Sequence, residues 1–325
     1  MAAQVPPADR LSAPPPWALA HVPGLEQGQA PLRVARLAGG SVNEVFRVDS
    51  AVGRFALRLD GPDWRRPGVD RQRELSLQRA AAAAGITPSL IYADASREGL
   101  LISVYESGRL WTGADYEDVQ ALRRLGERLY VLHRLPAPAL ALFDPWQVAQ
   151  EYVRVIQSAR SPVVSAQSLR ESLDRLQAEC ARLNETSLGA CIVHGDLTEA
   201  NLLEGSRLWL LDWEYAQLSD PFMDLACVLA YYPGAQRHSS ELAAAAGLDT
   251  ARLSEALRRA CTCIARWGGS GTSRAVSARA PRREAARRGR HPGIPGLASR
   301  RRGRQTNAPC GFRSAHADRA GDRSR

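Results

Sequence analysis

The sequence reads HGDLTEANLLEGSRLWLLD from His194 to Asp212, and this stretch decides the fold. The apolar run Leu208–Leu211 is typical of a short strand, which places Asn201 and Asp212 on opposite sides of a hairpin. Taken alone, an HGD tripeptide is often a turn, and an Asp after a strand is often a helix cap. The ordered combination of His194, Asp196, Asn201 and Asp212 is far less frequent by chance, so it indicates a chemical site.

The chemistry that suits these residue types is phosphoryl transfer. That reaction needs a carboxylate to orient the attacking hydroxyl, ligands for Mg²⁺ and a cation on the nucleotide phosphates. The spacing from His194 to Asn201 is H-x-D-L-x-x-x-N, which is the spacing of a kinase catalytic loop. Mg²⁺ prefers a few hard oxygen ligands plus water and phosphate oxygens, and Asn201 with Asp212 supplies such oxygens.

The wider stretch HGDLTEANLL…LWLLDWEYAQLSDPFMDLACVLAYY resembles the aminoglycoside phosphotransferase and choline kinase superfamily. Its wording is most similar to bacterial choline-kinase-like and thiamine-kinase-like members, and the resemblance covers about residues 33–267. It implies an α+β, two-lobed protein-kinase-like fold with a small antiparallel β-sheet N-lobe and a mainly helical C-lobe. It also implies transfer of the γ-phosphoryl group of ATP to a hydroxyl of a small molecule of the choline, thiamine, sugar or aminocyclitol class.

The resemblance implies a role for each polar residue of the stretch. Asp196 would be the catalytic base or hydroxyl-orienting group, and Asn201 and Asp212 would hold Mg²⁺. His194 would brace the loop from below. Asp224, in the run DPFMDLA, is expected to stabilise the loop rather than to act in catalysis.

The nucleotide clamp is expected in the N-terminal part, where Val34–Val48 reads as strand, glycine turn and strand. Gly39 and Gly40 allow the backbone to approach phosphates, and the exposed N–H groups of the turn can cradle them. We therefore assign Gly39, Gly40, Ser41 and Asn43 to ATP binding. The alternative is a plain hairpin turn, which is the usual meaning of paired glycines between strands.

The third strand, Arg54–Leu59, reads RFALRL and resembles the kinase strand that ends in a basic residue on the nucleotide phosphates. The chain contains no lysine, so Arg58 takes this place, and a guanidinium binds phosphate well. Glu74, on the predicted helix Asp70–Ala84, would fix the direction of Arg58. The alternative is a surface salt bridge worth at most about 1 kcal/mol. The order along the chain favours the functional interpretation.

The chain divides into four predicted segments. These are a loose, Pro-rich lead-in at 1–30, a nucleotide-clamping N-lobe at 31–108, a helical catalytic C-lobe at 109–267 and an Arg-rich tail at 268–325. Two further strands are expected in the N-lobe at 90–93 and 100–105. Short strands at 191–194 and 209–211 flank the proposed site. Hydrophobic periodicity predicts helices at 119–134, 146–159, 168–183, 221–231 and 253–267.

The charge of the chain is concentrated in the tail. The net charge is +9, but residues 268–325 carry 15 arginines against three acidic residues, which leaves residues 1–267 with a net charge of −3. The tail has few apolar residues and many helix breakers, so we expect it to be disordered. One interpretation is a nucleic-acid-binding tail. The preferred one is out-of-frame translation of a GC-rich gene.

The acceptor side departs from the family pattern. Members usually continue with helices that complete the acceptor pocket, whereas the helical pattern here fades near Trp267. The second hypothesis is therefore a catalytically impaired, nucleotide-binding kinase-like protein with a truncated acceptor site. The aromatic and acidic residues left to bind a cationic acceptor are Trp209, Trp213, Glu214, Tyr215, Tyr231 and Tyr232. We expect Trp209 and Tyr231 to be core residues, and Trp111 to pack in the seam between the lobes.

The remaining expectations concern the environment of the chain. None of the six cysteines forms a CxxC pair, which favours reduced thiols over a disulfide framework or a zinc site. No signal peptide and no apolar run long enough to span a membrane are evident. These features predict a cytoplasmic protein whose partner is a small hydroxyl compound, with nucleic-acid contact only through the tail. The oligomeric state is not predicted.

Overall fold

The computed structural model describes residues 11–37, 43–61, 65–95, 99–158, 166–186 and 189–251. All of these fall within one compact unit of the chain, residues 1–279. The predicted phosphate-binding residues Gly39, Gly40 and Ser41 lie outside the described residues. The same holds for the predicted helix at 253–267 and for the tail at 268–325.

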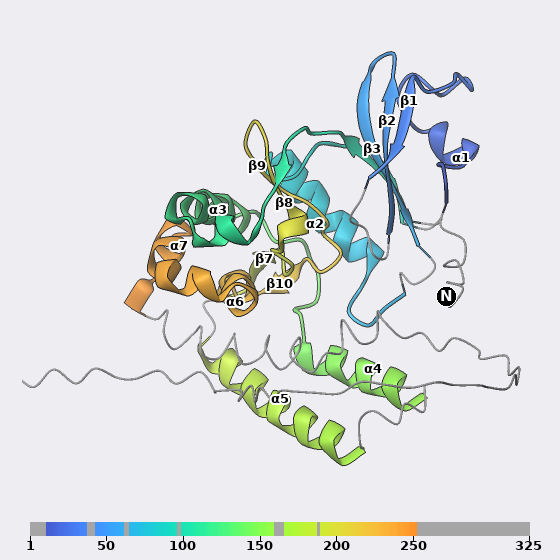
Figure 1. Ribbon diagram of the computed structural model, residues 1–325. Helices are drawn as coiled ribbons and strands as arrows, with labels where there is room; N and C mark the ends of the chain where they lie inside the picture. The colour runs from blue at the N-terminus through green and yellow to red at the C-terminus, as the bar shows by residue number, and fades with distance from the viewer. Residues whose placement is uncertain are drawn as a thin grey trace, which may run out of the picture. The chain divides into compact units, whose positions relative to one another are not determined.

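The N-terminal part is a five-stranded antiparallel sheet with the strand order β1-β2-β3-β5-β4 (Figure 1). Its strands are β1 (Arg33–Arg36), β2 (Asn43–Ser50), β3 (Gly53–Asp60), β4 (Leu90–Asp94) and β5 (Leu100–Val104). Burial alternates along β2 and β3, as expected when one face of a sheet covers a core. The strands predicted from the sequence are thus confirmed.

The stretch before β1 packs against this sheet. Helix α1 (Pro16–Leu19) is short, but Ala18, Val22 and Leu25 are at most 2% exposed and belong to the apolar core of the sheet. The Ser50 hydroxyl donates a hydrogen bond to the carbonyl of Pro23 at 2.7 Å. The expectation of a loose lead-in is therefore wrong for this segment. Its apolar residues are too few to show a clear period in the sequence.

Helix α2 (Arg71–Ala83) joins the sheet to the rest of the molecule. Asp70 caps its first turn by accepting two backbone N–H bonds, and Gly85, with φ +65°, follows its end. Leu77 and Ala81 are fully buried in the core of the helical part, not in the core of the sheet. The predicted helix is confirmed, and it also belongs to the packing of the C-terminal part.

The C-terminal part is mainly helical. Its α-helices are α3 (Val119–Leu132), α4 (Pro145–Ser158), α5 (Ala166–Thr186), α6 (Phe222–Tyr231) and α7 (Ser239–Ala245), with 3-10 turns at Gly113–Glu117, Glu199–Asn201 and Pro233–His238. The apolar stripe of α3 is buried, as its period of 3.6 predicts. Helix α7 packs against α3 at Gly126, and the sequence analysis missed it. Its sequence, SSELAAA, is too short to show a clear amphipathic pattern.

Short strands frame the motif stretch. β6 (Arg109–Leu110), β8 (Leu202–Glu204) and β9 (Leu208–Leu210) form one antiparallel sheet, and β7 (Cys191–Val193) pairs with β10 (Gln217–Ser219). Strands at the positions of β7 and β9 are expected from the sequence. The other three were missed because runs of two or three residues carry no detectable alternation.

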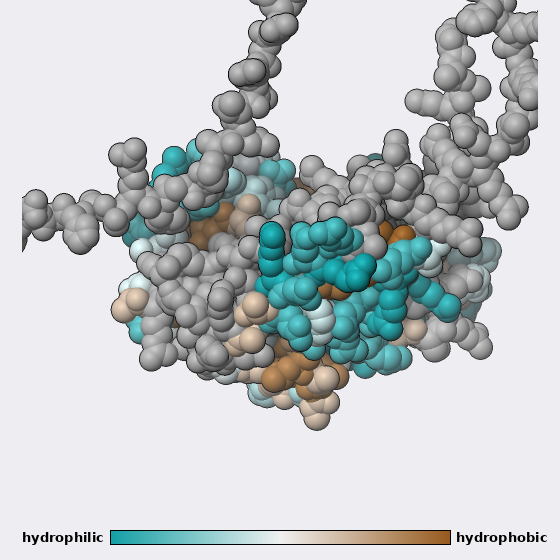
Figure 2. Space-filling model, turned by 90° about the horizontal axis from the view of Figure 1, so that it is seen from below, coloured by the Kyte–Doolittle hydropathy of each residue, from teal (hydrophilic) through white to brown (hydrophobic). Residues whose placement is uncertain are grey.

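Helices α4 and α5 contact each other and contribute little to the main core. Of their described side chains, only Val148 and Leu176 are buried. Seen from below, the described surface is largely hydrophilic, with smaller hydrophobic patches (Figure 2). None of the helices in the described ranges is long and apolar enough to cross a membrane.

The two cysteines whose side chains are described, Cys191 and Cys227, are buried and form no disulfide. Burial raises the pKa of the Cys191 thiol well above its usual value, and the charge of Asp224 adds to that rise. A thiol with a raised pKa is a poor nucleophile, so Cys191 serves packing rather than chemistry. This agrees with the expectation of reduced, buried thiols for these two positions.

Candidate active site

The loop after β7 brings Asp196 and Asn201 together. Gly195 has φ +75°, which turns the chain sharply after the strand. The side-chain amide of Asn201 donates to Oδ2 of Asp196 at 2.8 Å and to the backbone carbonyl of Asp196 at 2.9 Å. Both bonds use Nδ2, so the oxygen Oδ1 of Asn201 makes no hydrogen bond within the described part of the chain. A carboxylate and an amide oxygen are thus held at one place.

Asp224 anchors this loop from α6. It is fully buried, and its Oδ1 accepts hydrogen bonds from the backbone N–H groups of His194 at 3.0 Å and Gly195 at 2.9 Å. Its Oδ2 lies 2.9 Å from Nε2 of His133, at the end of α3. These bonds fit the loop-stabilising role expected for Asp224. The sequence analysis missed His133, because a histidine ending an amphipathic helix carries no motif of its own.

His194 lies beneath the loop and is fully buried. Its Nε2 contacts the carbonyl of Leu211 at 2.9 Å, and its Nδ1 accepts the backbone N–H of Asp196 at 3.3 Å. One donor and one acceptor nitrogen describe a neutral imidazole. Burial accordingly lowers the pKa of His194, although the charge of Asp224 opposes this shift. The contacts fit the bracing role that the resemblance implies.

Asp212 stands directly beyond β9, beside Asn201. The backbone N–H of Leu211 donates to the carbonyl of Asn201 at 2.8 Å, which fixes this neighbourhood. Asp212 has φ +57° and is the only non-glycine residue with a positive φ in the described ranges. Such backbone costs on the order of 1–3 kcal/mol and is concentrated at functional sites. Its Oδ1 is buried, accepts no hydrogen bond and lies 3.7 Å from Nη1 of Arg58.

Three carboxylates share this small region, and the residues present fit a divalent cation. Burial raises the pKa of Asp196 to about 7, and the charges of Asp212 and Glu214 add to the rise. Burial also raises the pKa values of Asp212 and Glu214. A cation would offset this repulsion. No three His, Cys, Asp or Glu side chains of the described residues form a metal cage, so a metal ion would also need Asn201 and non-protein oxygens.

Arg58 and Glu74 form a buried ion pair. Arg58 on β3 donates through Nη1 to Oε1 of Glu74 on α2, and both side chains are nearly inaccessible, at 12% and 1% exposed. Burial alone would raise the pKa of Glu74, but Arg58 and Arg71 outweigh it, and the pKa lies below its usual value. The alternative of a surface salt bridge is therefore wrong, because this pair is withdrawn from solvent.

Asn43 lies at the opposite end of the same charged cluster. Its amide nitrogen donates to Oε2 of Glu214 at 3.3 Å, and its amide oxygen accepts from Nη2 of Arg71 at 2.9 Å. Nη2 of Arg66 donates to the other oxygen of Glu214 at 2.9 Å. The sequence analysis missed Arg66 and Arg71. In a chain whose 43 basic residues are all arginine, neither residue stands out from the others.

The tryptophans near the site are packing residues. Trp209 is 7% exposed, which confirms the core expectation. Trp213 is fully buried and donates its indole N–H to the carbonyl of Leu210 at 3.2 Å, so it has no face open to a cationic acceptor. Trp111 is 2% exposed and packs in the core of the helical part, which includes residues of α2. This agrees with the packing role expected for it.

The two tyrosines that end α6 differ in environment. Tyr231 is 47% exposed, so the expectation of a core position for it is wrong. The helix presents its last turn to the surface there, and its sequence, apolar apart from Asp224, gives no sign of that. Tyr232 stacks on Tyr116 with ring centroids 3.5 Å apart, and its hydroxyl accepts the backbone N–H of Glu199 at 3.0 Å. Tyr232 thereby supports the loop that carries Asn201.

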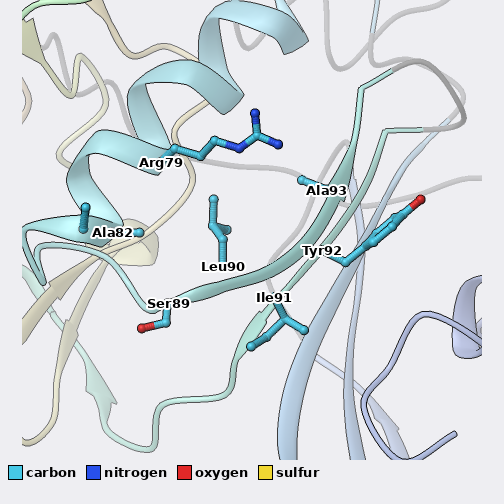
Figure 3. A pocket seen from close by; sticks show the side chains of 8 residues that line it. Arg79, Ala82, Ser89, Leu90, Ile91, Tyr92 and Ala93 are labelled. Carbon is cyan, nitrogen blue, oxygen red and sulfur yellow. The ribbon is translucent and has the colours of Figure 1, made fainter. Parts of the chain in front are cut away.

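A separate groove lies between α2 and the edge strand β4 (Figure 3). It is lined by Arg79, Ala82, Ala83 and residues 89–93. The side chain of Arg79 extends over it from the helix. None of the candidate site residues lines this groove, so it is not part of the arrangement around Asp196.

The amino-acid sequence of the chain is similar to those of known proteins. A family model described as "Phosphotransferase enzyme family" (APH) matches residues 33–259. Protein LicA of Haemophilus influenzae is 26% identical over 163 residues, which span 50% of this chain and 60% of the length of LicA. The match therefore covers less than two thirds of that relative.

Solved structures resemble the fold over most of its length. A choline/ethanolamine kinase family protein from Mesorhizobium loti has a TM-score of 0.63 and 22% identity, covering 80% of this chain and 85% of that one. The ADP-bound aminoglycoside phosphotransferase APH(2'')-Ib has a TM-score of 0.56 and 15% identity, covering 80% and 90%. At these identities the likeness shows the fold alone. It confirms the expected two-lobed, protein-kinase-like α+β architecture.

Proposed function

Because the chain belongs to the phosphotransferase enzyme family, we propose that it transfers the γ-phosphoryl group of ATP to a hydroxyl group of a small molecule. The observation that carries this proposal is the placing of Asp196, Asn201 and Asp212 around one point, with Arg58 beside Asp212. A carboxylate, metal-binding oxygens and a cation are the parts that phosphoryl transfer needs.

Asp196 orients the acceptor hydroxyl and takes its proton as the new O–P bond forms and the bond to ADP breaks. The transition state of phosphoryl transfer is loose, so positioning contributes more than the strength of the base. Asn201 and Asp212 hold Mg²⁺, which neutralises charge on the phosphate oxygens when it is bound with the nucleotide. The backbone fold behind them keeps the three side chains in place.

Arg58 binds the nucleotide phosphates, and Glu74 fixes the direction of its guanidinium. Gly39, Gly40 and Ser41, which lie outside the described residues, are proposed to contact the phosphates together with Asn43 at the start of β2. ATP is proposed as the donor, and the ADP found in one structural relative supports an adenine nucleotide. We propose two functional lobes, an N-lobe at 31–108 that binds the nucleotide and a C-lobe at 109–267 that carries Asp196, Asn201 and Asp212.

We propose an amino alcohol of the choline or ethanolamine kind as the first acceptor to test. The structural relative from Mesorhizobium loti carries that name and supports the choice. Thiamine, sugars and aminocyclitols are the alternatives, since fold and acceptor vary independently in such families. A cytoplasmic location is proposed with this function, because ATP and a small alcohol meet there.

The test measures ADP release by the full chain with Mg²⁺, ATP and a panel of small alcohols. The expected result is acceptor-dependent release that falls by at least about 100-fold in Asp196→Asn, because the hydroxyl loses its proton acceptor. Asp49→Asn is the matched control. Asp49 is a carboxylate on β2 that pairs with Arg47 at 2.7 Å, away from the site residues, and this change leaves release unaltered.

Two outcomes contradict the proposal. Equal release by the wild-type chain and Asp196→Asn removes Asp196 from the reaction. Binding of Mg²⁺ and ATP without transfer to any acceptor favours the second hypothesis, a catalytically impaired nucleotide-binding protein.

A further inference from the structure

The carboxylate of Glu74 is divided between two arginines. Oε1 accepts from Nη1 of Arg58, and Oε2 accepts from Nη1 of Arg71 at 2.6 Å. Arg58 therefore uses a single terminal nitrogen for Glu74. Its Nε is buried without a hydrogen bond, and no residue of the described ranges accepts a bond from its Nη2. The Nη2 group of Arg58 can therefore donate a hydrogen bond to another partner.

Arg71 is itself surrounded by acceptors. It is 5% exposed, and its Nη2 lies 2.7 Å from the carboxylate of Asp60 and 2.9 Å from Oδ1 of Asn43. Its Nη1 lies 3.5 Å from Glu214. These acceptors belong to the end of β3, the start of β2 and the segment just beyond Asp212. A buried cation in this position is held from several sides, so its guanidinium has little freedom to turn.

Removing Arg71 would change how Arg58 meets Glu74. Arginine and carboxylate favour a two-bond, fork-to-fork pair when both carboxylate oxygens are open. A cavity bordered by Arg58, Arg71 and Glu74 measures about 10 Å³, which is room for no more than about one water. A donor for the vacated Oε2 is then the second terminal N–H group of Arg58, whose Nη1 already binds the other oxygen of the same carboxylate.

We propose that Arg71 is a positioning residue for the nucleotide phosphates. By occupying Oε2 of Glu74 it limits Arg58 to one bond with that carboxylate, and it keeps Nη2 of Arg58 available to the phosphates. Arg71 also ties this pair to Glu214, two residues beyond the metal-binding Asp212. The inference rests on the proposed phosphate contact of Arg58, but not on the identity of the acceptor.

A double-mutant cycle tests this coupling directly. Arg71→Met removes the guanidinium at similar length, and Arg58→Lys replaces the fork with a single ammonium that cannot form the two-bond pair. The affinity of the full chain for ADP with Mg²⁺ is measured by titration calorimetry. Arg71→Met is expected to weaken binding about tenfold with Arg58 present, and no more than about twofold in the Arg58→Lys background.

Arg73→Met is the matched control. Arg73 is on the same helix and also bridges to the helical part, because its Nε donates to the carbonyl of Ala216 at 3.0 Å. It makes no hydrogen bond to Glu74. Arg73→Met removes a hydrogen bond between the two lobes without changing the contacts of Glu74. We expect it to change the ADP affinity by less than about twofold. Urea unfolding of each variant separates affinity from stability.

Equal losses in ADP affinity from Arg71→Met in both backgrounds, or an equal loss from Arg73→Met, would overturn the inference. Where Arg71→Met does not fold, Arg71→Lys replaces it. The lysine ammonium can still donate to Oε2 of Glu74, so we expect an ADP affinity within about twofold of the wild-type chain. A tenfold loss of affinity in a folded Arg71→Lys chain would overturn the proposal. A chain that binds ADP but transfers no phosphate to any acceptor contradicts the proposed function alone. The calorimetric cycle still decides the role of Arg71 in that case.

Discussion

At the scale of the residue, the geometry of the loop at Asp196 depends on the protonation state of one buried side chain. His194 meets a carbonyl oxygen with one ring nitrogen and a backbone N–H with the other. Only the neutral ring satisfies both partners, because a protonated ring would turn a second N–H toward the N–H of Asp196. Burial lowers the pKa of His194, and this favours the neutral ring that the two contacts need.

A pH dependence of stability follows from this. The pKa of His194 is lowered in the folded chain, whereas the unfolded chain takes up this proton near pH 6.5. The unfolded state binds more protons below that pH, so stability is lost as the pH falls through about 6.5, by at most about 1.4 kcal/mol per pH unit. Above about pH 7.5 both states are neutral and the contribution vanishes.

The measurement is urea unfolding at pH 5.5 and 7.5. We expect His194→Asn, which has no group titrating in this range, to lose less stability on acidification than the wild-type chain. His21→Asn is the control for removing a histidine, since His21 is an exposed residue stacked on Tyr92. A loss of the same size in the wild-type chain and in His194→Asn would show that His194 does not supply this dependence.

At the scale of the element, the segment before the sheet is part of the N-terminal core. The prolines before α1 are typical of a linker. In the structure, however, Ala18, Val22 and Leu25 are buried in the same apolar core as Phe46. Val34 of the edge strand β1 packs against the same core. A five-stranded sheet has a small core, so each covering side chain has a large share in its stability.

Leu25→Ala is expected to destabilise the chain by about 2–5 kcal/mol, because it leaves a cavity under the sheet. Leu32→Ala is the matched substitution, since Leu32 lies in the same segment but is 75% exposed. It should change stability by no more than about 0.5 kcal/mol. Thermal or urea unfolding checks both variants. Equally small losses of stability in both variants would show that this segment does not belong to the core.

At the scale of the whole molecule, α2 makes the two parts interdependent. Its polar side carries the Arg71 and Glu74 cluster, and its apolar side places Leu77 in the core of the helical part. Behind it, the backbone N–H of Leu210 donates to the carbonyl of Ile86 at 3.1 Å. One helix therefore contacts both the proposed phosphate clamp and the core beneath the proposed catalytic loop.

Leu77→Ala is therefore expected to weaken both parts together. A cavity at this fully buried position should cost about 2–5 kcal/mol. Hydrogen exchange read by mass spectrometry should show faster exchange in β2 and β3 as well as in α3. Leu142→Ala, at a position 65% exposed, is the control and should leave exchange unchanged. Faster exchange confined to one part would show that the lobes unfold independently.

The sequence by itself determined the order of the candidate site residues and most of the elements that carry them. Asp196, Asn201 and Asp212 are close along the chain, so a loop and a hairpin suffice to bring them together, and local spacing reports this. The long strands and helices were readable for a similar reason, because periods of 2 and 3.6 record which face is buried. The short strands and α7 were not, since they complete too few periods.

Only the tertiary structure decided the surroundings of these groups. The contacts of Arg71 with Glu214, of Asn43 with Glu214 and of His133 with Asp224 join segments far apart in sequence. Each acidic residue could pair with many of the arginines in this chain, so the sequence does not identify its partner. Which charges become buried together depends on how the lobes pack around α2, and that packing is a property of the folded molecule.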